Sequence, residues 1–147
     1  MFYFIYFFAL MRHKWYVFLE CTKAGIPWQG ITHDLSKFRP AEFVPYAHYW
    51  GKKPEDRTAA EIKAYTETVL SHKARNPHHW EWWVRGTVAE PMTSKYRAEM
   101  LCDWRGPGRA YNGRDKSSEF YEKNTKLITM HPSTRAWLEE NLRPKKR

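Results

Sequence analysis

The stretch TAAEIKAYTETVLSHKA, residues 58–74, carries the clearest helical pattern in the sequence. Thr58 is followed three residues later by Glu61, the spacing of a capping box, in which each side chain hydrogen-bonds the other residue's backbone N–H. Apolar side chains then recur at spacings of three and four residues, as on one face of an α-helix. They are Ala59, Ala60, Ile62, Ala64, Tyr65, Val69 and Leu70. We therefore predict a helix over Thr58–Ala74.

Glycine, proline and capping residues divide the rest of the chain into further helices. Gly25 is placed to end a first helix, and Asn76-Pro77 is placed to open another as its N-cap and first helical residue. The triplet Gly106-Pro107-Gly108 should end a helix abruptly. The other expected helices are Tyr3–Lys23, Ile31–Phe38, Ala41–Trp50, Asn76 through Trp83, Met92–Arg105, Ser117–Thr129 and Ser133–Leu142, with a loop at Gly51–Arg57 and a linker at Gly86–Pro91.

The fold class follows from these helices and from the length of the chain. No segment shows strand-like alternation of useful length, and no repeat is present. A chain of 147 residues suits one domain with one core, and eight Trp, nine Tyr and eight Phe supply large side chains to fill it. We predict an all-α single domain, a bundle of about six to eight helices over residues 1–142, followed by a basic tail, residues 143–147.

The two cysteines and the apolar N-terminal run bear on location. Cys21 and Cys102 form no CxxC pair, so we expect buried thiols in a reducing compartment and a cytoplasmic protein. The run MFYFIYFFAL, residues 1–10, is shorter than the roughly 20 apolar residues that span a bilayer. We expect it to begin a buried first helix; a leader preceding Met11 and a peripheral membrane anchor are the alternatives.

The charge balance favours anionic partners. Lys and Arg total 25 against 16 Asp and Glu, a formal net charge of +9. Nucleotides, nucleic acids and phosphorylated metabolites all fit such an excess. The tail Arg143–Arg147 serves either solubility or nucleic-acid binding, and a homo-oligomer is compatible with the composition.

The adjacent pair His33-Asp34, in ITHDLSKF, is the first chemical signal. His13 lies twenty residues upstream, and a Gly/Pro turn between them lets the first helix fold back antiparallel. Asp103 lies in the apolar stretch MLCDW, where a buried carboxylate is costly unless it pairs with or coordinates a cation. The alternative is structural: Asp34 caps its own turn, His33 packs in the core and His13 lies on a polar helix face.

The order His … His-Asp … Asp on successive helices resembles the HD superfamily of metal-dependent phosphohydrolases. Lys37, three residues after Asp34, resembles the last position of the His-Asp-x-x-Lys variant of that superfamily. The segments HDLSKF, NPHHW and EMLCDW also resemble a small bacterial and phage family with no assigned activity. The first resemblance implies an HD-like helical fold, and the second covers most of the chain.

The HD resemblance implies that His13, His33, Asp34 and Asp103 bind one divalent transition metal ion and leave positions for water and phosphate. Imidazole and carboxylate suit Mn, Fe, Co, Ni or Zn alike. Such an ion lowers the pKa of a bound water and polarises the phosphoryl oxygen. We therefore expect hydrolysis of a phosphate ester, with a nucleotide as substrate. The alternative is a nucleic-acid-binding or ligand-sensing protein on a degenerate HD scaffold.

A second group of histidines, His72, His78 and His79, flanks the corner between two expected helices. A helix opening at Asn76 would direct free N–H groups and a positive dipole end outward, which suits a phosphate. Lys73 and Arg75 lie beside this corner. The three histidines are therefore ligands of a second metal ion, phosphate contacts or surface residues.

Several further residues lie close to these groups in the sequence. We expect Asp34, Lys37 and Glu99 to be catalytic: Lys37 contacts phosphate or holds Asp34, and Glu99, one turn before Asp103, orients a metal-bound water or pairs with Lys37. Exposed positions for Lys37 and Glu99 are the alternatives, and Glu42 has a status similar to that of Glu99. Four tryptophans either stack a nucleobase or fill the core: Trp80, Trp82, Trp83 and Trp104. The segment Arg105–Arg109 is expected to be a flexible basic loop that can close over an anion.

Overall fold

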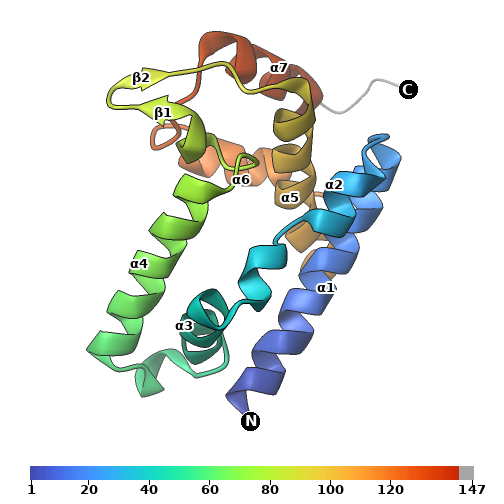
Figure 1. The fold of residues 1–147 in the computed structure, drawn as a ribbon. Coiled ribbons are helices and arrows are strands. Elements are labelled where there is room, and N and C mark those ends of the chain that lie inside the picture. Colours follow the sequence, from blue (N-terminus) through green and yellow to red (C-terminus); the bar gives the residue numbers. More distant parts are fainter. Residues whose placement is uncertain (143–147) are drawn as a thin grey trace.

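The computed structural model describes residues 1–142 as seven α-helices with three short 3₁₀ helices and one small hairpin (Figure 1). The elements are α1 (Phe2–Lys23), α2 (Pro27–Thr32), η1 (Leu35–Phe38), α3 (Pro40–Trp50), η2 (Pro54–Asp56), α4 (Ala59–Arg75), η3 (Trp80–Trp83), β1 (Val84–Arg85), β2 (Val88–Ala89), α5 (Ser94–Asn112), α6 (Ser117–Asn124) and α7 (Pro132–Leu142). The predicted all-α class is confirmed. The predicted tail, residues 143–147, lies outside the described residues.

The long helix α1 forms one side of the molecule and packs against α5, α2 and α3. Its buried side chains Tyr6 and Leu10 contact Tyr46 and Ala47 of α3, so residues 1–10 do begin a partly buried first helix. Within residues 1–142, no helix combines the length and the apolar character needed to cross a bilayer.

The helix α4 begins as its sequence predicts. The backbone N–H of Glu61 donates to Thr58 Oγ1 over 3.2 Å, and the N–H of Thr58 donates to Glu61 Oε2 over 3.0 Å. Both halves of the capping box are therefore present. In Figure 1, α4 stands opposite α1, and its C-terminal end rises toward the hairpin.

The segment after α4 differs from the prediction. No helix opens at Asn76-Pro77, because the Asn76 side chain donates to the carbonyl of His72, 2.7 Å away, at the end of α4. The chain then turns into η3 and the antiparallel hairpin, whose turn includes Gly86 at φ +60°. The predicted linker Gly86–Pro91 is thus partly hairpin. Its two-residue strands are too short to produce an alternating pattern in the sequence.

The helix α5 also differs, because it continues through Gly106-Pro107-Gly108 to Asn112. A Cβ atom at Gly106 would lie 2.7 Å from Val17 Cγ2 of α1, and one at Gly108 would lie 2.7 Å from the backbone N of Lys116. The glycines therefore permit close packing rather than ending the helix. The expected basic loop at 105–109 is wrong for the same reason. The helix α5 ends at Asn112, and Gly113, at φ +69°, is its C-cap.

Two other helix boundaries differ from the predicted ones. The expected helix Ile31–Phe38 is interrupted at Asp34, whose φ of 55° is left-handed, so α2 and η1 are separate elements. The helix α6 ends at Asn124 rather than near Thr129.

The largest core cluster lies among α5, α6 and α7 and comprises Met92, Met100, Leu101, Tyr121, Ile128 and Leu138. Between α1 and α5, Val17 packs with Cys21 and Cys102. Both thiols are free and buried, as predicted.

Candidate metal centre

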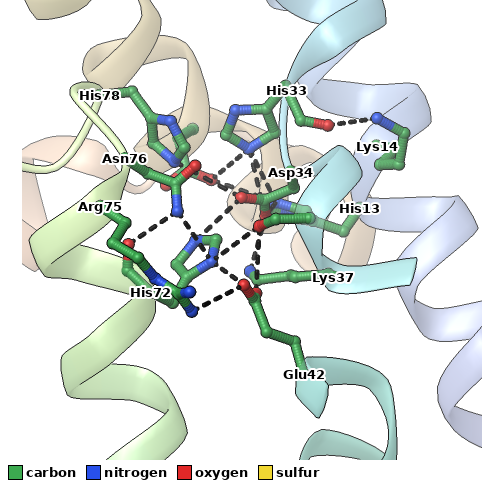
Figure 2. Close-up of polar contacts among 12 residues, drawn as sticks. His13, Lys14, His33, Asp34, Lys37, Glu42, His72, Arg75, Asn76 and His78 are labelled. Carbon is green, nitrogen blue, oxygen red and sulfur yellow. Dashed lines mark hydrogen bonds and ion pairs between the residues drawn. The ribbon is translucent and has the colours of Figure 1, made fainter. Parts of the chain in front are cut away.

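Histidine and carboxylate side chains from five segments meet in the interior of the molecule (Figure 2). They come from α1, the turn between α2 and η1, the end of α4, the turn before η3, and the middle of α5. These segments are distant in sequence, and the packing of α1 against α5 brings the first and last of them together.

The left-handed backbone of Asp34 places its side chain in the centre of this cluster. A positive φ is uncommon for a residue with a side chain, although Asp and Asn tolerate it better than most. Asp34 is the one residue other than glycine with positive φ in the described chain, and it is buried. Such strain is typical of functional positions.

The first group consists of His13, His33 and Asp103, which offer ligand atoms within 4.8 Å of one another. Nε2 of His13 lies 3.1 Å from Asp103 Oδ1, and Nε2 of His33 lies 3.3 Å from the same oxygen. Asp34 Oδ2 lies 3.5 Å from His13 Nε2 and 3.4 Å from His33 Nε2. The structure thus brings together all four residues that the sequence indicated as metal ligands.

The second group consists of Asp34, His72, His78 and His79, again with ligand atoms within 4.8 Å of one another. Asp34 Oδ1 lies 3.1 Å from His72 Nε2 and 3.5 Å from His78 Nε2. This oxygen and the Nε2 atoms of the three histidines are buried, and none of them has a hydrogen-bond partner among residues 1–142. Buried polar atoms are normally satisfied, so four unsatisfied ones side by side fit a bound cation.

Asp34, a member of the second group, also faces the first group through its other oxygen. Its Oδ2 faces His13 and His33, whereas its Oδ1 faces His72 and His78. One carboxylate can therefore serve two adjacent cation sites. The expected phosphate site at a helix N-terminus is wrong here, because no helix begins at Asn76.

Buried carboxylates orient the imidazole rings from behind. Glu99 Oε1 lies 3.1 Å from His33 Nδ1 and 3.3 Å from His78 Nδ1. Glu42 Oε2 lies 2.8 Å from His72 Nδ1. Contacts of this kind fix the tautomer and the ring orientation of a metal-binding histidine. Glu99 was expected to orient water or to pair with Lys37; its ion-pair contacts are instead with the two rings.

The three basic side chains expected near the centre take different positions. Lys37 Nζ lies 2.6 Å from Asp34 Oδ2 and is largely buried, so it holds the shared carboxylate. Lys73 pairs with Glu81 over 2.7 Å, and Arg75 is more exposed and lies 3.4 Å from Glu42.

The electrostatics favour the ligand form of several groups. Burial alone would raise the pKa of Asp34, but the charges of His33 and Lys37 hold this pKa well below its usual range. The pKa of Asp103 is likewise lowered, against burial, by His33 and His13. Burial and the neighbouring His78 lower the pKa of His79, which keeps its ring neutral. His33 is the exception: against the effect of burial, Asp34 and Asp103 raise its pKa to about 10, so a metal ion at this ring must displace a proton.

A cavity of about 480 Å³ opens beside the cluster, with Asp103 and His79 in its wall. Four aromatic side chains also line it, namely Trp80, Trp104, Tyr111 and Phe120. Of the four tryptophans considered for stacking, Trp80 and Trp104 line this cavity. Trp83 packs on the core, and Trp82 packs on Trp83 and beneath Arg85. Tyr111 and Phe120 carry no sequence signal, because both lie beyond the point where α5 was expected to end.

Comparison with known proteins gives one match. The model of DUF5662, a family of unknown function, matches residues 3–144 and so includes every residue of both groups. Searches of curated proteins and of solved structures find no matching chain.

Proposed function

We propose that this chain, which belongs to the DUF5662 family of unknown function, is a metal-dependent phosphohydrolase of the HD type with two neighbouring metal sites. One observation carries the proposal: the Nε2 atoms of His72, His78 and His79 lie around Oδ1 of Asp34, and none of these four buried atoms has a hydrogen-bond partner among residues 1–142. The other oxygen of the same carboxylate faces His13 and His33. Burying so many ionisable groups together is costly without cations to bind them.

The donor set determines which ions fit. Imidazole nitrogens and carboxylate oxygens suit Mn, Fe, Co, Ni or Zn. His13, His33, Asp103 and Asp34 would hold one ion, and His72, His78, His79 and Asp34 would hold the other. Bound ions of this kind supply an activated water and neutralise phosphoryl oxygens.

The remaining residues of the centre position these ligands. Lys37 fixes one oxygen of Asp34, so its role is to hold the bridge rather than to contact phosphate. Glu99 orients one ring from each group, His33 and His78. Because Glu99 acts on both sites, its loss should impair both together.

The cavity supports a substrate with an aromatic portion. Phosphate placed at the Asp103 side of the centre would leave its organic group among Trp80, Trp104, Tyr111 and Phe120. Aromatic walls stack nucleobases readily. Lys116 adds positive charge at the same cavity, where the charge of Lys73 is paired with Glu81; a cation in this position suits a nucleotide.

The test begins with the metal content of the purified chain after incubation with Mn or Co. Two ions per chain are expected, with turnover of a phosphoester panel that includes nucleotides. His13→Ala and His79→Ala should each remove one ion, while His131→Ala, which replaces a histidine outside both groups, should remove none. A chain that binds no metal, or Asp34→Ala retaining activity, would refute the proposal. Metal binding and ligand binding without turnover would point instead to a ligand-sensing module.

A further inference from the structure

We propose that the outer face of α1, together with α2 and η1, binds the surface of anionic phospholipid membranes. This proposal is independent of the metal centre, since it concerns side chains that face away from it. It assigns a use to exposed apolar residues that neither the core nor the cavity employs.

A stripe of large apolar side chains follows the outer face of α1. Phe4, Phe8, Met11 and Trp15 are spaced by four, three and four residues, which places them on one side of the helix. Their exposed fractions include 69% for Phe4, 67% for Phe8 and 57% for Trp15. The buried side chains of α1, among them Tyr6, Leu10 and Val17, occupy the opposite side.

The apolar surface continues onto the neighbouring elements. Trp28 of α2 is 71% exposed, and Ile31 and Leu35 are about half exposed. The rings of Phe7 and Phe38 meet edge to face, with centroids 6.5 Å apart, which joins η1 to α1. In Figure 1, α2 lies alongside α1 at the edge of the molecule.

The size of this surface reaches the upper end of what a typical monomer exposes in one apolar patch. An aromatic side chain presents roughly 150–250 Å², so the exposed fractions of Phe4, Phe8, Trp15 and Trp28 amount to roughly 400–650 Å². That alone matches the largest apolar patch of a typical soluble monomer, about 300–600 Å². The aliphatic side chains enlarge it further, so the surface needs a partner.

The charges identify the partner as anionic. Residues 1–40 contain two acidic side chains, Glu20 and Asp34, and both are buried. The charged side chains that this segment exposes are basic. They are Arg39, Lys23, which pairs with Glu20 over 2.7 Å, and Arg12, whose guanidinium lies over the Tyr111 ring of α5. A second copy of the chain would bring like charges together, whereas anionic headgroups complement them.

The geometry fits a helix lying in the membrane surface. Because Tyr6, Leu10 and Val17 hold α1 against the rest of the fold, only its outer stripe can enter a bilayer. Aromatic side chains on one face and basic residues beside them are the composition of interfacial helices, which bury their apolar face to the headgroup boundary.

Vesicle co-sedimentation tests the proposal with the full chain. Vesicles of phosphatidylcholine mixed with phosphatidylglycerol should bind it, those of phosphatidylcholine alone should bind far less, and added salt should weaken the binding. Phe4→Ser combined with Phe8→Ser should reduce binding at least about tenfold, since two of the aromatic side chains that would enter the bilayer surface are lost. Lys23→Gln combined with Arg39→Gln should reduce binding to the anionic vesicles selectively.

The matched control is Val88→Ser combined with Leu127→Ser, which removes two apolar side chains that are 64% and 75% exposed elsewhere on the molecule. This control should bind like the original chain, and circular dichroism should show that all variants remain helical. Equal binding by the Phe4/Phe8 variant would overturn the proposal. A chain that binds neither kind of vesicle would also overturn it. In that case light scattering tests for a dimer that dissociates in the Phe4/Phe8 variant, a result that would assign the surface to a second copy of the chain.

Discussion

Replacing Asp34 with Asn tests the shared carboxylate with little change in shape. Asn is nearly isosteric with Asp and tolerates the left-handed backbone, here at φ 55°, so the local fold should persist. The substitution removes the negative charge that faces His13 and His33 through one oxygen and His72 and His78 through the other. Both metal sites should therefore weaken together.

The structure also sets the cost in stability. Lys37 Nζ, 2.6 Å from Asp34 Oδ2, would be left without its anion, and the Lys37 side chain is only 17% exposed. Leaving one partner of a buried pair uncompensated costs about 3–5 kcal/mol. For a domain of this size, a loss of 3 kcal/mol lowers Tm by roughly 10 °C. This cost should appear with a chelator present, because it arises from the ion pair.

Adding Lys37→Met separates the two roles of Asp34. Without the buried ammonium, the double variant should recover most of the lost Tm, since an apolar side chain of similar volume replaces a buried ion pair at little cost. Metal content should not recover. Calorimetry and metal analysis of the three proteins measure both effects. An Asp34→Asn variant that keeps two metal ions and its original Tm would refute the assignment of Asp34 as a bridge.

Four further outcomes follow from the geometry. Tyr111→Ala should raise KM for a nucleotide about tenfold, because a stacked base contributes roughly 1–3 kcal/mol, while kcat for a small aliphatic phosphate stays unchanged in steady-state assays. Gly108→Ala should lower the free energy of unfolding by about 1–3 kcal/mol in urea titrations, since the new Cβ would meet the backbone of Lys116. Thr58→Ala should cost about 1 kcal/mol in the same titrations through the lost cap. Metal affinity measured by calorimetry should rise as the pH increases toward the raised pKa of His33, about 10, and should fall on acidification. The reason is that the ion must displace a proton from the His33 ring. An affinity that is independent of pH would exclude His33 as a ligand.

The elements that the sequence predicted well are those with local signals. The capping box at Thr58 and the apolar spacing after it depend only on neighbours within the helix, and α4 begins where they indicate. The four residues of the first ligand set were indicated by the resemblance to the HD superfamily, which depends on the order His … His-Asp … Asp; the His33-Asp34 pair alone is a weak signal. The metal-binding role of these residues remains a prediction.

The elements that the sequence did not predict depend on distant contacts. Gly106 and Gly108 read as helix breakers, yet they let α5 pack closely against α1 and against the turn near Lys116. Nothing near Glu99 in sequence indicates that it faces His33 and His78. The two oxygens of Asp34 face different groups because its backbone has a positive φ, and no local sequence pattern indicates that conformation.

The ligand atoms of the centre come from residues as distant as His13 and Asp103, so the unfolded chain lacks the complete ligand sets and binds a metal ion less tightly than the native one. Any cation that the centre holds therefore shifts the equilibrium toward the native state, by about 1.4 kcal/mol for each tenfold excess of ion over its Kd. Proteases degrade the unfolded fraction in cells. Starving a culture of the correct ion should consequently lower the amount of this protein that accumulates, before any effect on its chemistry is measured.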